Sequence, residues 1–125
     1  PRDMPALTKG YKLQKKAAKV GFDWDDVNGV FAKIEEELAE LKEAVRSNQS
    51  AEERKLELGD LLFATANVAR FIDTDPEEAL AATNRKFTQR FRYIEERLRE
   101  LGRTPADSNV EEMEQFWQAA KKAGL

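Results

Sequence analysis

The stretch ELGDLLFATANVARF, residues 57–71, indicates a helix at the centre of the fold. Its apolar residues face almost every side after Leu56, and a helix that is apolar all round belongs in the interior of an assembly. Glu57 and Asp60 lie inside this run, three positions apart and therefore on one face of the helix. Burying two unpaired carboxylates is costly, so the pair requires basic partners or a bound cation.

A second acidic stretch, KIEEELAELKEA at residues 33–44, lies on the preceding predicted helix. A helix turns by about 100° per residue, which places Glu37 and Glu40 side by side on one flank of the apolar stripe. Lys33 shares that flank, and the other glutamates of the stretch point elsewhere. Such an acidic run alone is typical of a solvated helix face. The ordered pattern E-x-x-E, sixteen residues and E-x-x-D is much more specific.

If the two helices pack side by side, the four carboxylates converge, and such a cluster needs a cation to stay ionised. Oxygen ligands favour a hard cation, with Mg²⁺ first and Mn²⁺ as a substitute. The chain has no histidine and no cysteine, which excludes histidine metal sites, imidazole bases and disulfides. A di-iron bundle is disfavoured because that class pairs glutamate with Glu-x-x-His motifs. A helical interaction module with solvated acids is the non-enzymatic alternative.

Apolar periodicity is helical throughout, so we expect one all-α domain over residues 1–125, built from helical hairpins and resembling a four-helix bundle. The expected helices are 7–20, 25–46, 51–72, 76–101 and a short one capped by Ser108 and Glu111. No apolar run approaches the roughly 18–20 residues of a membrane span. Without a signal peptide or cysteine, a reducing cytoplasm is the expected location.

A basic and aromatic set of residues follows the acidic motifs. In NRKFTQRF, residues 84–91, Lys86 and Arg90 lie one helical turn apart and follow Asn84, a pattern that a solvated basic flank explains equally well. Trp117 and Lys121 are four positions apart and share one helix face. The tryptophan is either a core residue or a stacking surface for a nucleobase, with the lysine near its phosphates.

In this order the segments resemble those of the MazG nucleoside triphosphate pyrophosphohydrolases, in particular the C-terminal MazG domain of two-domain bacterial proteins. The resemblance runs from KKAAKVGFDW at residues 15–24, through both acidic motifs, to FWQAAKK at residues 116–122. The start at Pro1, without a methionine, fits a trimmed chain or a C-terminal fragment of a longer protein.

The resemblance implies an all-α fold that dimerises, and Mg²⁺-dependent cleavage of NTPs and dNTPs into nucleoside monophosphate and pyrophosphate, a nucleotide-pool house-cleaning reaction. It implies these metal-binding and catalytic residues: Glu37, Glu40, Glu57 and Asp60. It implies these substrate-binding residues: Lys86, Arg90, Trp117, Lys121, Lys33 and Asn84. Which acid acts as the general base stays open, with Glu40 as the first candidate. The preferred nucleobase and sugar and the choice between pool cleaning and alarmone control also stay open.

Two further expectations concern partners and turnover. The apolar circumference of the third helix is more than a small monomer covers, so we expect at least a dimer. We expect no membrane and no nucleic-acid polymer as partner. A regulatory domain that binds nucleotide with little turnover is the alternative function.

Overall fold

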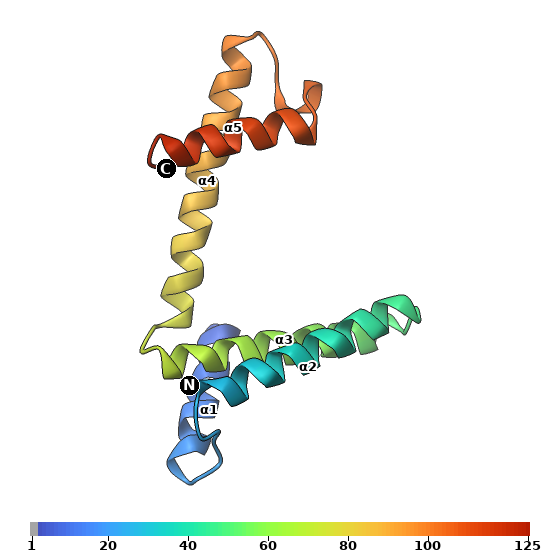
Figure 1. The fold of residues 1–125 in the computed structure, drawn as a ribbon, viewed down its shortest axis with the longest axis vertical. Helices are drawn as coiled ribbons and strands as arrows, with labels where there is room; N and C mark the ends of the chain where they lie inside the picture. The colour runs from blue at the N-terminus through green and yellow to red at the C-terminus, as the bar shows by residue number, and fades with distance from the viewer. Residues whose placement is uncertain (1–2) are drawn as a thin grey trace. The chain divides into compact units, whose positions relative to one another are not determined.

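The computed structural model describes residues 3–125 and is all-helical, as the sequence predicts. The elements are α1 (Ala6–Lys19), α2 (Val27–Arg46), α3 (Ala51–Phe71), α4 (Pro76–Glu100), the 3₁₀ helix η1 (Pro105–Asp107) and α5 (Val110–Lys122) (Figure 1). No strand occurs in this described part of the chain. The chain forms two compact units, with the boundary inside α4 after Ala79.

In the first unit, α2 and α3 form a hairpin and lie side by side, and α1 packs against α3 (Figure 1). Small buried residues on α3, among them Ala64 and Ala66, let the helices approach closely. Gly10 of α1 faces Phe63, and a Cβ at Gly10 would lie 3.3 Å from the ring. The side-chain amide of Gln14 donates to the carbonyl of Phe63 at 3.0 Å and joins the same two helices.

Polar caps set the starts of the first-unit helices. Asp26 accepts a hydrogen bond from the N–H of Asn28, so α2 begins at Val27, two residues later than predicted. The hydroxyl of Ser50 accepts from the N–H of Glu53 at the start of α3, as expected from the capping pattern.

The second unit contains the rest of α4, η1 and α5, with a small core of Ile94, Leu98 and Ala120. The prediction that Ser108 caps the last helix is wrong. Asn109 is the cap, and its side chain accepts from the N–H of Glu112 at 2.8 Å. The unpredicted η1 ends at Asp107 and is followed by Ser108 in an extended conformation, so α5 starts one residue later than the predicted cap requires. The hydroxyl of Ser108 donates to the side chain of Glu112 instead.

Large apolar side chains remain uncovered on α2. Phe31, Leu38 and Val45 recur every seven residues and are 45%, 39% and 60% exposed. Leu58 and Leu62 form a second exposed apolar pair, one turn apart on α3. No helix within the described residues is both long enough and apolar enough to cross a membrane.

Candidate metal centre and adjoining cavity

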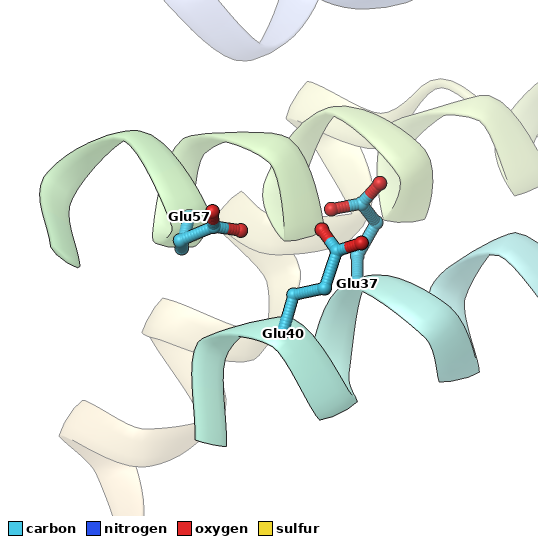
Figure 2. A group of neighbouring side chains, drawn as sticks. All are labelled: Glu37, Glu40 and Glu57. Carbon is cyan, nitrogen blue, oxygen red and sulfur yellow. The ribbon is translucent and has the colours of Figure 1, made fainter. Parts of the chain in front are cut away.

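Three carboxylates from two helices meet in the first unit. One oxygen each of Glu37, Glu40 and Glu57 lies within 4.8 Å of the other two (Figure 2). Glu37 and Glu40 extend from α2 toward α3, which carries Glu57 (Figure 2). Glu37 is only 6% exposed, Glu57 is half-buried and Glu40 is exposed. The α2–α3 hairpin therefore brings together three of the four carboxylates that were predicted to converge.

The cluster holds more negative charge than its neighbours neutralise. The charge on Glu37 raises the pKa of the Glu40 carboxyl, and desolvation and the charge on Glu57 add to this effect. Oε2 of Glu37 and Oε2 of Glu57 are buried without a hydrogen-bond partner among the described residues. Lys33 reaches Oε1 of Glu37 at 3.1 Å, and this contact raises the lysine pKa. The unused carboxylate oxygens fit a hard divalent cation, so the cluster could bind metal.

Asp60 lies outside this three-carboxylate cluster. It is exposed and lines a cavity together with Glu37. Its side chain is one methylene shorter than that of glutamate, which limits its reach from α3. A role for Asp60 as fourth ligand stays a prediction.

A cavity of about 520 Å³ adjoins the cluster and is lined by α1, α2, α3 and the loop between α1 and α2. Phe22, Trp24 and Phe63 provide aromatic lining. Glu37 belongs to both the acidic cluster and the cavity lining, so the two features are continuous. The volume of the cavity falls within the range of small-molecule sites, and its lining combines apolar and aromatic side chains with polar and charged ones.

An ion pair fixes the loop that carries Trp24. Arg70 of α3 donates to both oxygens of Asp23, at 2.6 and 3.3 Å. Asp23 also accepts from the backbone N–H of Trp24 at 2.8 Å. The indole packs against Gly29 of α2, where a Cβ would lie 2.8 Å from the ring, so this close approach requires glycine. Asp23 and Gly29 together hold the aromatic wall of the cavity.

The contribution of Asp23 to stability is expected to depend on pH. Its hydrogen bond with Arg70 lowers the pKa of Asp23 below the ordinary value of 3.8. A lowered pKa means that this stabilisation is present above pH 3.8 and is lost as the pH falls through the native value. We expect Asp23→Asn to lower the free energy of unfolding by about 0.5–1 kcal/mol at pH 7 for this partly exposed pair. Urea unfolding of wild type and Asp23→Asn should show that their difference in the free energy of unfolding disappears as the pH falls below about 3.8. A difference that does not change with pH would contradict the ion pair between Asp23 and Arg70.

The predicted basic and aromatic residues lie in the second unit. Arg90 stacks over the ring of Trp117 at 5.1 Å and donates to the carbonyl of Leu125. Trp117 also contacts Phe87 at 5.5 Å and is half-buried, so it packs against α4. Asn84, Lys86 and Lys121 are exposed. The structure brings Arg90 and Trp117 together, and contact of this group with the acidic cluster stays a prediction.

Sequence reasoning missed the cavity. Residues 21–24 lie between two predicted helices and were used only for the family resemblance, although two aromatic residues flank Asp23 there. Asn67 and Arg70 also line the cavity, and the one available signal was a polar Asn67 within an apolar helical run.

Comparison with known proteins identifies the family. A family model described as the MazG nucleotide pyrophosphohydrolase domain matches residues 25–94. The chain belongs to the MazG family. The match includes α2, α3 and the first part of α4, and thus all three carboxylates of the cluster.

Three relatives resemble the chain over nearly all of its length. The Thermotoga maritima protein named nucleoside triphosphate pyrophosphohydrolase/pyrophosphatase MazG is 43% identical over 94% of this chain and 45% of its own length. The Escherichia coli K12 nucleoside triphosphate pyrophosphohydrolase is 41% identical over 98% of this chain and 47% of its own length. The uncharacterized Bacillus subtilis protein YabN is 50% identical over 98% of this chain and 25% of its own length. The chain thus spans about half of the first two relatives and a quarter of the third.

Proposed function

We propose that this MazG domain hydrolyses nucleoside triphosphates, both NTPs and dNTPs, to nucleoside monophosphate and pyrophosphate with Mg²⁺ as cofactor. The observation that carries the proposal is the acidic cluster, with its unpaired buried oxygens, which shares Glu37 with the lining of a cavity that has aromatic walls. The names of the Thermotoga and Escherichia relatives support the same reaction. Nucleotide-pool cleaning is the role that fits this reaction.

The metal would be held by Glu37, Glu40 and Glu57, with Asp60 as the fourth ligand that the family resemblance implies. When bound, Mg²⁺ neutralises charge on the phosphate oxygens. Lys33 holds the Glu37 carboxylate in place through its 3.1 Å contact. Carboxylates and a lysine fill these roles, so the proposed chemistry needs no histidine, and the chain has none.

The hydrolytic step joins the oxygen of water to the α-phosphorus and breaks the bond from that phosphorus to the oxygen bridging to the β-phosphate. The bond electrons leave with pyrophosphate. Glu40, exposed beside the cluster, is the proposed base that accepts the proton of the attacking water. Lys86 and Arg90 are proposed to stabilise the phosphate charge. Trp117, Lys121 and Asn84 complete the proposed substrate contacts.

The nucleoside part of the substrate is proposed to occupy the cavity. Phe22, Trp24 and Phe63 offer ring faces for stacking on a flat base. Glu37 is part of the cavity lining, so the acidic cluster lies beside the cavity. This arrangement suits a nucleotide, which has a heterocycle at one end and phosphates at the other.

A product assay tests the reaction. We expect the protein with Mg²⁺ to convert NTPs and dNTPs to monophosphate and pyrophosphate, and excess EDTA to lower the rate at least about 100-fold because the phosphate charge is no longer neutralised. Chromatography of nucleotides and separate assays for pyrophosphate and orthophosphate provide the measurement. Release of orthophosphate as the primary product would mean that a different bond is cleaved and would refute the proposal.

A regulatory module that binds nucleotide with little turnover is the second candidate. It is favoured by the position of Asp60 outside the cluster, which leaves three acids together instead of four. Nucleotide binding in calorimetry without release of pyrophosphate would select this alternative.

Self-association is also proposed, with at least two copies covering the exposed α2 stripe of Phe31, Leu38 and Val45. Spacing by seven residues suits a seam between packed helices.

A further inference from the structure

We infer that Asn67 recognises a carbonyl oxygen of the nucleobase, and that Arg70 and Asp23 form a positioning pair that fixes the orientation of its side-chain amide. The inference rests on the proposed function, since it places the base in the cavity. It names keto bases, such as hypoxanthine, guanine and uracil, as the preferred substrate class.

Asn67 is a buried polar side chain of the cavity that lies outside the acidic cluster. It is 6% exposed, lies on α3 among apolar neighbours and lines the cavity. Its Oδ1 accepts a hydrogen bond from Nε of Arg70 at 2.6 Å. No hydrogen bond described within residues 3–125 uses its Nδ2. This NH₂ group is not among the fully enclosed atoms that lack a partner, so it is open to a ligand that supplies an acceptor.

The orientation of this amide follows from chemistry. Arginine has only N–H donors, so the oxygen of Asn67 must face Arg70 and the NH₂ group must point away from it. The remaining guanidinium nitrogens of Arg70 donate to Asp23, which in turn accepts from the N–H of Trp24. The Arg70–Asp23 pair therefore orients the side-chain amide of Asn67. It also holds Trp24, which belongs to the aromatic wall on which the base is proposed to stack.

A fixed NH₂ group discriminates between base edges. It pairs with a carbonyl oxygen, which offers two lone pairs, and it meets an exocyclic amino group as donor against donor. Hypoxanthine and adenine differ at position 6 in this respect, oxygen against amino group. A base with an amino group at this position would leave the NH₂ group of Asn67 unpaired. A site of this kind gives a larger ratio of kcat/KM between two substrates than an apolar pocket does.

The test compares inosine triphosphate with adenosine triphosphate in wild type and Asn67→Asp. Aspartate keeps the size of the side chain and an oxygen for Arg70, and replaces the NH₂ donors with an acceptor. We expect wild type to favour inosine triphosphate by about 10-fold or more in kcat/KM, and the variant to lose or reverse this ratio. The change should lie mainly in KM, because the acidic cluster is unaltered.

Three controls separate recognition from general damage. Asn28→Asp makes the same chemical change at an exposed position and should leave the ratio at its wild-type value. Ribose 5-triphosphate, which lacks a base, should be hydrolysed equally by wild type and Asn67→Asp. Mn²⁺ binding, followed by electron paramagnetic resonance, should also be equal. A second variant, Asp23→Asn, should reduce the ratio without changing Mn²⁺ binding, because it loosens Arg70.

The inference is overturned if wild type does not prefer inosine triphosphate, or if Asn67→Asp keeps the wild-type ratio. Calorimetric binding of the two triphosphates makes the same comparison without turnover. A protein that binds them with the expected preference but releases no pyrophosphate would refute the proposed hydrolysis and leave the role of Asn67 intact.

Discussion

Replacing Glu37 with glutamine is expected to lower kcat/KM for triphosphate hydrolysis by roughly 10²–10³-fold, the range seen when one group that stabilises transition-state charge is removed. Glu37 is the buried member of the acidic cluster, and one of its oxygens has no partner among the described residues. Glutamine keeps the shape and removes the charge that a divalent ion requires. Steady-state kinetics with Mg²⁺, together with Mn²⁺ binding by electron paramagnetic resonance, would measure both losses.

The matched control for this change is Glu35→Gln. Glu35 lies two residues away on the same helix and is exposed, outside the cluster. We expect wild-type turnover from this control, and thermal unfolding of Glu37→Gln without metal should show that the fold persists, because the lost charge repelled Glu40. Wild-type turnover in Glu37→Gln would show that the cluster is not the metal site.

Local signals account for most of the fold that the sequence predicted. The predicted cap Ser50 acts within three residues of its partner Glu53, and apolar stripes repeat within a few turns. The error at Ser108 arose because the preceding Pro105–Asp107 segment forms a 3₁₀ turn, which moved the cap to Asn109. Several residue types can cap a helix, so a neighbouring turn decides between adjacent candidates.

The acidic cluster could be predicted because it depends on helix geometry and one hairpin, whereas the cavity depends on contacts between residues far apart in the sequence. Helical pitch alone places Glu37 beside Glu40, and one hairpin brings in Glu57. The cavity instead depends on the contact between Asp23 and Arg70, which are 47 positions apart in sequence. Only the tertiary packing of the loop against α3 shows that these two residues meet.

The second large effect is expected on self-association. Leu38 lies in the middle of the exposed α2 stripe, between Phe31 and Val45. Full burial of a leucine contributes about 1.5–3 kcal/mol, and a symmetric dimer buries the side chain twice. Leu38→Lys should therefore weaken the dimer by about 10²–10⁴-fold in Kd, since each 1.4 kcal/mol corresponds to tenfold.

Light scattering at micromolar concentration provides the measurement, with Ala39→Lys as the control. Ala39 is the next residue on α2 and is exposed, and it is turned by about 100° from Leu38, so its added charge should leave the mass unchanged. A monomer mass for wild type would refute self-association itself. A dimeric Leu38→Lys would place the contact elsewhere, for instance at the exposed Leu58 and Leu62 of α3. Because Leu38 directly follows Glu37, Mn²⁺ binding by monomeric Leu38→Lys would also tell whether one copy suffices to form the metal centre.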